Sequence, residues 1–263
     1  MSRIAERLAA LKAEGRKGLI VYITAGAPDL TATLQAVKAA EEAGADMIEL
    51  GIPFSDPMAD GPVIQKAAML ALKSGTSTAK VVELVGQIRQ FSRIPLAAMT
   101  YINSVLNFGQ AKFVDAFGQA GLDGLIVPDL PSEEAAELEG ICRQAGLALI
   151  QFVAPTTDSQ RIASICDKAS GFIYCVSTTG VTGVRQVDYS SIGAVMDTVR
   201  RHTGVPLAIG FGIGTPAAAK AAAEYADAVI VGSAVMQALM DEGAEAVRTL
   251  VQSIRQALDE GVR

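Results

Sequence analysis

Residues 47–62 of this chain read MIELGIPFSDPMADGP, a short apolar strand followed by a loop rich in glycine, proline and aspartate. The strand carries a carboxylate, Glu49, between Ile48 and Leu50, and the loop carries a second one, Asp60. A charged group in an apolar strand needs a polar partner or a chemical task, because burying an unpaired charge is costly. Two carboxylates in different surroundings can divide the roles of acid and base when their pKa values are pushed apart.

Similar short apolar runs recur along the whole chain. Each is apolar on both faces, as expected for a strand that is covered on both sides. The predicted strands are Leu19–Ile23, Met47–Leu50, Leu96–Met99, Gly124–Val127, Ala148–Phe152, Phe172–Val176, Pro206–Ile209 and Ala228–Val231.

Segments with apolar residues about 3.6 residues apart lie between these strands, and this period predicts helices. They are Thr31–Ala43, Val63–Leu72, Ala79–Gln90, Ala111–Ala120, Glu133–Gln144, Ser159–Lys168, Ile192–Arg201 and Ala217–Ala223. A glycine after a helix supplies the left-handed conformation that ends many helices. The predicted stops of this kind are Gly44, Gly121, Gly146 and Gly204.

Strand and helix therefore alternate eight times within 263 residues. This order predicts parallel strands and an α/β fold, a (β/α)8 TIM barrel. A doubly wound open sheet is the alternative, but the turn at residues 24–28, TAGAP, lacks the spacing G-x-G-x-x-G. We expect a single domain over residues 1–263, with an extra helix from Ser2 to Glu14 that covers the bottom of the barrel.

The composition argues against several classes of protein. Lys and Arg number 22 against 28 Asp and Glu, a net charge of −6 that disfavours nucleic-acid binding. No apolar run approaches the roughly 18 residues that span a membrane, and the charged start lacks the core of a signal peptide. The three cysteines, Cys142, Cys166 and Cys175, form no C-x-x-C motif, which predicts buried thiols in a reduced, cytoplasmic setting.

In such barrels the active site lies at the carboxyl ends of the strands, and this rule places Glu49 and Asp60 on the same face. The alternative interpretation is that Asp60 only helps to form a turn before Gly61. The single histidine, His202, falls at a helix end on the opposite face. We expect no metal, because no cluster of histidine, cysteine or carboxylate has ligand spacing. A Schiff base is disfavoured because Lys66, Lys73, Lys112 and Lys220 fall on predicted helices.

Glycine-rich loops follow the last two predicted strands. Residues 210–216 read GFGIGTP, in which Thr215 and Pro216 are typical of a helix start, and residues 232–234 read GSA. Backbone N–H groups at such helix starts bind anions, and these two loops are the usual phosphate site of a TIM barrel. Ser233 is interpreted as a phosphate contact, since no histidine base is near it. The small residues after Val176 suggest a lid, with a connection of no function as the alternative.

These motifs resemble those of the tryptophan synthase alpha chain family over nearly the full length. The most specific is ELGIPFSDPMADGP at residues 49–62, supported by PDLP at 128–131, GVTG at 180–183, GFGI at 210–213 and GS at 232–233. The resemblance implies a lyase of L-tryptophan biosynthesis that cleaves indole-3-glycerol phosphate to indole and glyceraldehyde 3-phosphate. It also implies that this chain itself holds no cofactor.

The resemblance assigns roles to residues. Glu49 would be the general acid and base, and Asp60 would accept a hydrogen bond from the indole N–H and stabilise positive charge there. The implied substrate-binding residues are Tyr22 and Phe211 at the indole ring, Tyr174 near the carboxylates, Thr182 in the lid, and Gly183, Gly212, Ile213, Gly232 and Ser233 at the phosphate.

The resemblance further implies a partner, a beta chain that holds pyridoxal phosphate and receives indole through a tunnel, with two alpha and two beta chains in the assembly. The loop from Pro53 to Asp60 and the segment from Tyr101 to Phe108 would face it. The candidate contact residues are Pro53, Asp56, Asn103 and Asn107.

Two departures from the family pattern stand out. The pair Thr178-Thr179 occupies a place where some members carry a basic residue, and Tyr22 replaces a familiar phenylalanine. Two other functions stay open from the sequence. The chain could chiefly bind and activate a beta chain, or it could be another phosphate-binding barrel enzyme, such as an isomerase or epimerase. The latter would more often need a lysine, cysteine or metal set.

Overall fold

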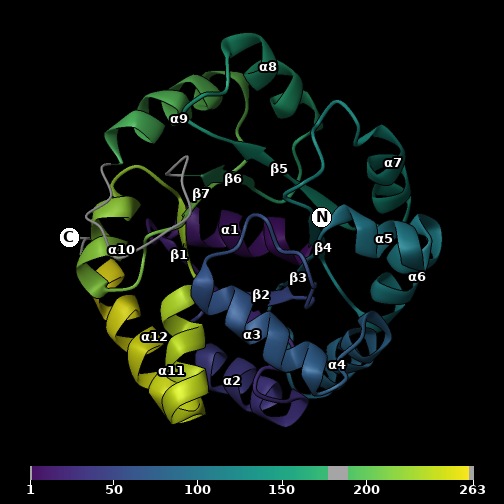
Figure 1. Cartoon of the computed structure of the whole chain (residues 1–263). Helices are drawn as coiled ribbons and strands as arrows, with labels where there is room; N and C mark the ends of the chain where they lie inside the picture. Colours follow the sequence, from purple (N-terminus) through teal and green to yellow (C-terminus); the bar gives the residue numbers. More distant parts are fainter. Residues whose placement is uncertain (1, 177–188, 261–263) are drawn as a thin grey trace.

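The computed structural model describes residues 2–176 and 189–260, in which eight parallel strands close into a barrel (Figure 1). The strands follow one another around the barrel in chain order, and β8 pairs with β1. The predicted TIM barrel is confirmed, and the open sheet was the wrong alternative. The strands are β1 (Gly18–Thr24), β2 (Met47–Gly51), β3 (Leu96–Met99), β4 (Gly124–Ile126), β5 (Ala148–Val153), β6 (Ile173–Val176), β7 (Leu207–Gly210) and β8 (Ala228–Val231).

Helices surround the barrel, and the predicted ones all form. They are α1 (Arg3–Ala13), α2 (Leu30–Glu42), α3 (Pro62–Lys73), α4 (Thr78–Phe91), α6 (Gln110–Ala120), α7 (Ala136–Gln144), α8 (Ser159–Lys168), α9 (Ser190–His202) and α10 (Pro216–Ala223). Three more were given no range from the sequence: α5 (Ile102–Phe108), α11 (Ser233–Glu242) and α12 (Ala244–Asp259).

Two local predictions were wrong. Helix α7 begins at Ala136 rather than Glu133, because the chain first forms a turn in which Glu134 N–H donates to the Pro131 carbonyl at 2.9 Å. The left-handed stop predicted at Gly204 is absent, since the chain already leaves α9 in an extended conformation at Thr203, with φ −148° and ψ 153°. The stops at Gly44, Gly121 and Gly146 do have positive φ, as predicted.

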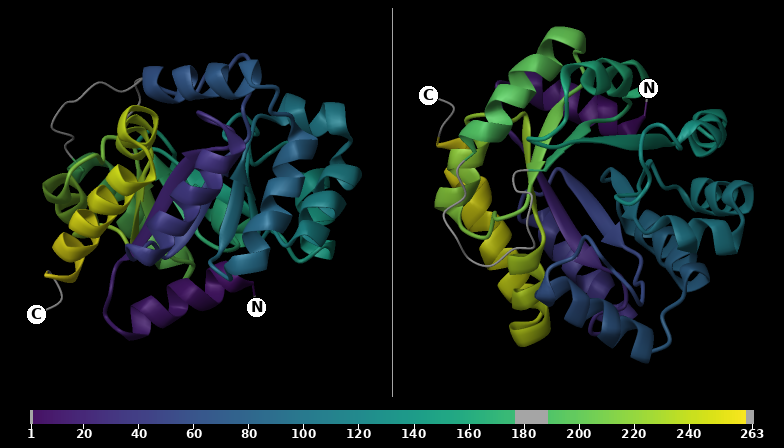
Figure 2. Two further views of the ribbon diagram at one scale, coloured as in Figure 1. Left: turned by 90° about the horizontal axis from the view of Figure 1, so that it is seen from below. Right: turned by 45° about the horizontal axis from the view of Figure 1, so that its top comes forward.

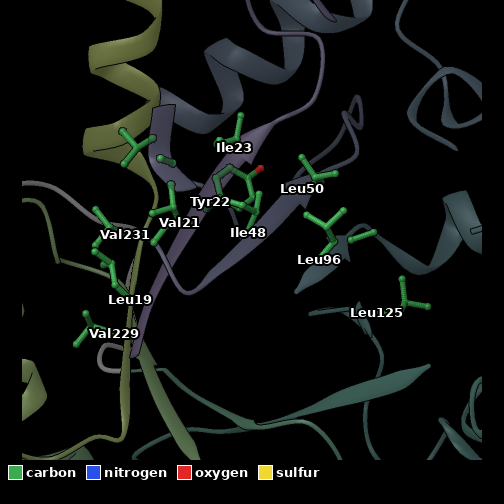
Figure 3. Packing of buried hydrophobic residues seen from close by; sticks show 14 of the residues in the cluster. Leu19, Val21, Tyr22, Ile23, Ile48, Leu50, Leu96, Leu125, Val229 and Val231 are labelled. Atoms are coloured by element: carbon green, nitrogen blue, oxygen red, sulfur yellow. The ribbon is translucent and has the colours of Figure 1, made fainter. Parts of the chain in front are cut away.

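The alternation of side chains along the strands creates two apolar layers. Figure 3 shows part of the outer layer, in which Leu19 and Val21 of β1 lie beside Val229 and Val231 of β8 and pack toward the helices. The inner layer fills the barrel with the remaining strand residues, such as Ile20, Met47, Ile126 and Ile150.

Helix α1 closes one end of the barrel, as the sequence predicted. It lies across the end opposite to α3 (Figure 2, left), and its buried residues Ile4, Leu8 and Leu11 join the inner apolar layer. Ser2 caps the helix by accepting a hydrogen bond from Ala5 N–H at 3.4 Å. This closed end leaves the carboxyl ends of the strands as the open mouth.

Three aspartates, two of them buried and the third half-buried, tie strands together at the closed end. Asp46, Asp123 and Asp227 each precede an even-numbered strand, and each accepts a hydrogen bond from a backbone N–H at the start of the strand before it. The donors are Leu19 at 2.8 Å, Leu96 at 2.9 Å and Leu207 at 2.9 Å. Because the carboxylates accept these bonds, the strand starts are held in register.

Arginines balance the charge of two of these aspartates. Asp123 pairs with Arg89 at 2.7 Å and with Arg3 of α1 at 2.7 Å. Asp46 pairs with Arg255 of α12 at 3.1 Å and with Arg7 of α1 at 2.5 Å. The first and last helices are therefore bound to the barrel through its buried carboxylates.

Replacing Asp123 by alanine should lower the free energy of unfolding by roughly 3–5 kcal/mol, because Arg89 would stay partly buried without its partner. The matched control is Asp197→Ala, which removes an exposed pair with Arg200 and should lose less than about 1 kcal/mol. Urea unfolding of the two variants measures both values. Equal losses would show that the aspartate at the barrel end has no special role.

Candidate functional site

Glu49 lies inside the barrel at the second strand. It is 1 % exposed, and neither of its carboxylate oxygens has a hydrogen-bond partner within the described residues. Its neighbours across the ladder are Tyr22 on β1 and Ala97 on β3. Burial raises the pKa of Glu49 from 4.5 to about 8, and the nearby charge of Asp60 adds to this rise. At neutral pH Glu49 therefore holds a proton that it can donate.

Asp60 reaches the same mouth from the loop after β2. The Tyr101 hydroxyl donates to Asp60 Oδ2 at 3.1 Å and accepts from Ala59 N–H at 3.0 Å. Burial raises the pKa of Asp60 from 3.8 to about 6, and the hydrogen bond from Tyr101 opposes this rise. Asp60 is thus largely ionised at neutral pH, which separates its protonation state from that of Glu49.

Tyr101 is a site residue that sequence reasoning missed. The segment Tyr101–Phe108 was assigned only to a partner surface, but Tyr101 is buried and Phe54 of the Asp60 loop stacks on its ring at 5.1 Å. The residue stands at the start of α5, whose first N–H, on Ile102, donates to Asp129 at 2.9 Å. The useful signal was a tyrosine placed directly beyond the end of a barrel strand.

Aromatic side chains line the barrel near the two carboxylates. Tyr174 on β6 stacks on Phe152 at 5.1 Å and meets Phe211 edge to face at 6.1 Å between ring centres. Phe211 has a left-handed backbone, with φ 77°. The sequence identified Tyr174, Phe211 and Tyr22 but missed Phe152, because the inward face of β5 becomes known only with its register.

Two glycines make room for phenol groups at the mouth. A Cβ added at Gly51 would lie 2.0 Å from the Tyr22 hydroxyl oxygen, and one added at Gly210 would lie 2.2 Å from the Tyr174 hydroxyl oxygen. Burial raises the pKa of both tyrosines, and the negative charges of Glu49 and Asp60 raise them further. Both phenols therefore stay neutral and able to donate hydrogen bonds.

The glycine-rich loops of β7 and β8 lie side by side at the mouth. Thr215 caps α10 by accepting from Ala218 N–H at 3.2 Å, with Pro216 as the first helical residue, as predicted. Helix α11 begins at Ser233 directly after Gly232. A Cβ added at Gly214 would lie 3.3 Å from the Ala234 Cβ, so the two loops are in contact.

This arrangement suits an anion whose oxygens accept hydrogen bonds from both helix starts. Two helix N-termini from adjacent strands direct backbone N–H groups and positive partial charge toward the mouth. Ile213 is buried, whereas Gly212 and Ser233 are exposed at the mouth. The predicted contacts Thr182 and Gly183, the pair Thr178-Thr179 and the lid that contains them lie outside the described residues.

The residues expected to face a partner gather at one edge of the mouth. Pro53 and Asn107 line a surface cavity of 340 Å³ together with Phe54 and Leu72, and Asp56 and Asn103 are exposed nearby in the chain. Two hydrophobic side chains of the same segments are exposed as well, Met58 after β2 at 82 % and Leu106 on α5 at 52 %. Exposed apolar side chains that gather in a patch often mark a protein interface.

Other chemistry finds little support in the described part of the chain. No group of three or more histidine, cysteine, aspartate or glutamate side chains could hold a metal ion there. His202 is the last residue of α9, as predicted, and its side chain is exposed. Lys66, Lys73, Lys112 and Lys220 all lie on helices outside the barrel. No helix among the described residues is long and apolar enough to cross a membrane.

Comparison with known proteins gives a consistent result. The family model described as tryptophan synthase alpha chain matches residues 8–262. The tryptophan synthase alpha chain of Synechococcus elongatus is 45 % identical over 98 % of each chain, and that of Citrifermentans bemidjiense is 46 % identical over 100 % of each. A crystal structure of tryptophan synthase subunit alpha from Legionella pneumophila superposes with a TM-score of 0.91, at 36 % identity and 99 % coverage of both chains.

Replacing Glu49 by glutamine should make the protein more stable above pH 5. Because the folded pKa of about 8 exceeds the unfolded value of 4.5, the ionisable side chain weakens folding progressively between these two values. Between these two pKa values the gain in free energy of unfolding of the variant over the parent chain grows by about 1.4 kcal/mol per pH unit. Below the unfolded pKa this gain is absent. Unfolding curves from pH 4 to 9 measure the difference from the parent chain. Glu83→Gln, on the exposed face of α4, is the control. If the free energy of unfolding of Glu49→Gln differed from that of the parent chain by the same amount at every pH, the raised pKa of Glu49 would be contradicted.

Proposed function

This chain belongs to the tryptophan synthase alpha chain family, and we propose that Glu49 and Asp60 carry out the family's reaction at the open mouth of its barrel. The reaction is the cleavage of indole-3-glycerol phosphate to indole and glyceraldehyde 3-phosphate in tryptophan biosynthesis. The chain is therefore an enzyme subunit of the lyase class, which excludes an unrelated isomerase or epimerase. We also propose that residues 1–263 act as a single domain.

One observation supports this assignment most strongly. Two carboxylates share one mouth, but Glu49 is desolvated and unpaired whereas Asp60 accepts a hydrogen bond from Tyr101. Their pKa values of about 8 and about 6 fall on opposite sides of neutrality. A retro-aldol cleavage of this kind needs an acid that protonates C3 of the indole. It also needs a negative charge that stabilises the positive charge that develops on the indole nitrogen.

The proposed reaction begins with Glu49 as the acid. Its proton goes to C3 of the indole, and the electron pair comes from the enamine of the five-membered ring, so that N1 becomes positive. Asp60 accepts the hydrogen bond of N1–H and stabilises this charge as an ion pair in a buried setting. The bond between C3 and the glycerol carbon then breaks, and its electrons restore the indole.

The same glutamate completes the cycle as the base. The glycerol hydroxyl on the breaking bond becomes the aldehyde of glyceraldehyde 3-phosphate and loses its proton to the Glu49 carboxylate. Because Glu49 gives one proton and receives one, the enzyme returns to its starting state. Tyr22, Tyr174 and Phe211 would hold the indole ring, since they line the barrel around Glu49.

The phosphate would bind at the two helix starts. Gly212 and Ile213 precede α10, while Gly232 and Ser233 begin α11, and their loops are in contact. The sequence adds Thr182 and Gly183 as further contacts by resemblance. Anchoring the phosphate there fixes the far end of the substrate, and this orients the breaking bond relative to Glu49.

The partner of this chain is a beta chain. A structural relative at 32 % identity comes from a tryptophan synthase of M. tuberculosis in its aminoacrylate-bound form. We propose an assembly of two alpha and two beta chains, with pyridoxal phosphate in the beta chain alone. Pro53, Asp56, Asn103 and Asn107 would form the contact, because Pro53 and Asn107 line one surface cavity and Asp56 and Asn103 are exposed on the segments that carry Met58 and Leu106. The buried free thiols of Cys142, Cys166 and Cys175 support a reduced, cytoplasmic location.

The Glu49→Gln substitution tests the catalytic assignment. It should lower kcat for indole release by roughly 10²–10⁴, the usual contribution of a general acid and base. Asp60→Asn should also reduce kcat, through loss of the negative charge at N1. Glu83→Gln is the matched control and should keep full activity. Near-normal turnover of Glu49→Gln, with binding of unreactive indole-propanol phosphate unchanged, would remove Glu49 from the mechanism.

A charge placed at Leu106 tests the partner surface. Leu106→Asp should weaken activation by a beta chain at least about tenfold in its apparent Kd, and should leave the rate of the isolated chain unchanged. Phe91→Asp is the control, since Phe91 is 47 % exposed but lies at the closed end of the barrel. Equal effects of both variants would contradict the proposed surface.

The same assay tests how far this chain turns over the substrate without its partner. Indole release is measured with the chain alone and with a beta chain added. A measurable rate alone that rises on addition supports a lyase subunit. No turnover under either condition would instead indicate a subunit that only activates its partner.

A further inference from the structure

Asp129 joins two loops at the open mouth of the barrel. It follows β4 in a short turn, in which Leu130 N–H donates to the Val127 carbonyl at 3.2 Å. Its side chain accepts a hydrogen bond from Ile102 N–H, on the first residue of α5, at 2.9 Å. The carboxylate of one loop therefore caps a helix that begins after the neighbouring strand, β3.

Helix α5 depends on this cap. The helix has only seven residues, and a helix of about two turns is marginal without contacts from outside it. Its N-cap residue, Tyr101, makes no side-chain hydrogen bond to the helix start. A carboxylate at a helix N-terminus accepts a bond from an otherwise unpaired N–H group and interacts favourably with the helix dipole. Asp129 thus supplies from another loop the cap that the segment of α5 lacks.

Tyr101 directly precedes Ile102 and holds the loop of Asp60. Its hydroxyl accepts from Ala59 N–H at 3.0 Å and donates to Asp60 Oδ2 at 3.1 Å. Phe54, near the start of the same loop, stacks on its ring with 5.1 Å between ring centres and 23° between ring planes. Because one side chain makes all three contacts, its position determines the position of the Asp60 carboxylate.

The charge of Asp60 also depends on this phenol. The titratable groups that face Asp60 are Glu49 of β2, Tyr22 of β1, Tyr174 of β6 and Tyr101. Burial raises the pKa of Asp60 to about 6, and only the hydrogen bond from Tyr101 opposes this rise. The described residues supply no cation that would replace it. Loss of the phenol would therefore raise the pKa of Asp60 further.

Asp129 influences Asp60 through the tyrosine rather than directly. Burial and the charge of Asp60 raise the pKa of Tyr101, and the charge of Asp129 adds to this rise. Burial and the Tyr101 hydroxyl govern the pKa of Asp60, to which the charge of Asp129 does not contribute. Tyr101 is therefore the link between the two carboxylates.

We propose that Asp129 is a positioning residue of the lyase reaction, which caps α5 and so keeps the Tyr101 phenol on Asp60, an inference that rests on the proposed role of Asp60 in that reaction. Asp129 acts through two groups in series, the first N–H of α5 and the phenol. Without the cap the phenol leaves Asp60, and the loop then presents a displaced and more often protonated carboxyl to the indole nitrogen.

Asp129→Ala should lower kcat for indole release by roughly 10-fold to 10²-fold at neutral pH, since a misplacement of about 1 Å can cost this much. Asp129→Asn keeps a carbonyl oxygen for Ile102 N–H and should stay within about threefold of the parent chain. Asp158→Ala is the matched control, because it removes an exposed carboxylate that caps α8 through Arg161 N–H at 2.8 Å. Equal losses in Asp129→Ala and Asp158→Ala would contradict the proposal.

The pH dependence distinguishes positioning from a general loss of structure. In Asp129→Ala the acid limb of the kcat profile should move to higher pH by roughly one pH unit, because Asp60 loses the hydrogen bond that favours its charged form. Tyr101→Phe, which retains the ring that stacks on Phe54, should move the limb equally. Lower activity with an unmoved limb would overturn the proposal.

The effects of Asp129 and Tyr101 should not add, because both residues act on Asp60 in series. The double variant Asp129→Ala/Tyr101→Phe should have the kcat of Tyr101→Phe alone, within about a factor of two. Losses that multiply would show that Asp129 acts elsewhere and would overturn the proposal.

A second variant removes the same hydrogen bond and leaves Asp129 in place. Ile102→Pro deletes the N–H donor at the first helical position, where proline is favoured. Tyr101 already has the extended backbone that a residue before proline requires, with φ −95° and ψ 149°. This variant should reproduce the moved acid limb, and it decides the question if Asp129→Ala does not fold. An unmoved limb in folded Ile102→Pro would overturn the proposal.

A titration that needs no turnover separates this inference from the proposed function. Carbon NMR signals of labelled aspartate carboxyls report the pKa of Asp60, whose signal is identified by its absence in Asp60→Asn. This pKa should rise above about 6 in Asp129→Ala and in Ile102→Pro, and should not change in Asp158→Ala. An unchanged pKa in the first two would overturn the positioning role, whatever the activity of the chain. Full activity of Asp60→Asn would instead contradict the proposed function.

Discussion

The pairing of the strands at the closed end determines what reaches the open end. Asp46, Asp123 and Asp227 accept backbone hydrogen bonds there and hold the starts of neighbouring strands in register. A slip of one residue would exchange the inner and outer rows of a strand. Tyr22 and Glu49 are direct neighbours in the ladder between β1 and β2, so the same register that closes the barrel places a phenol beside a carboxylate inside it.

Burial then gives each polar group its chemical character. Glu49 and Asp60 are both carboxylates, but only Asp60 has a protein hydrogen-bond donor among the described residues, the Tyr101 hydroxyl. This single contact opposes the rise in the pKa of Asp60, while nothing comparable opposes the rise for Glu49. The barrel thus loses some stability at Glu49, and in return it holds a protonated acid at a pH where a solvated glutamate would be ionised.

The sequence was sufficient where a signal is local. Apolar runs located every strand to within one residue, and an acid within an apolar strand identified Glu49. It was insufficient where a residue acts through a face or a distant contact. Phe152 and Tyr101 each required the strand register or the path of a loop before their contacts with Tyr174 and Asp60 became visible. Helix α12 is different, because its buried Val247, Val251, Ile254 and Leu258 recur at helical spacing and could have been assigned.

Glu49 poses a physical question, because an apolar residue would fill its position at lower free energy and neither of its carboxylate oxygens has a hydrogen-bond partner among the described residues. In the proposed reaction the substrate supplies the missing partner. A structural glutamate would be paired within the fold, so its unpaired state supports a chemical task rather than a contribution to stability.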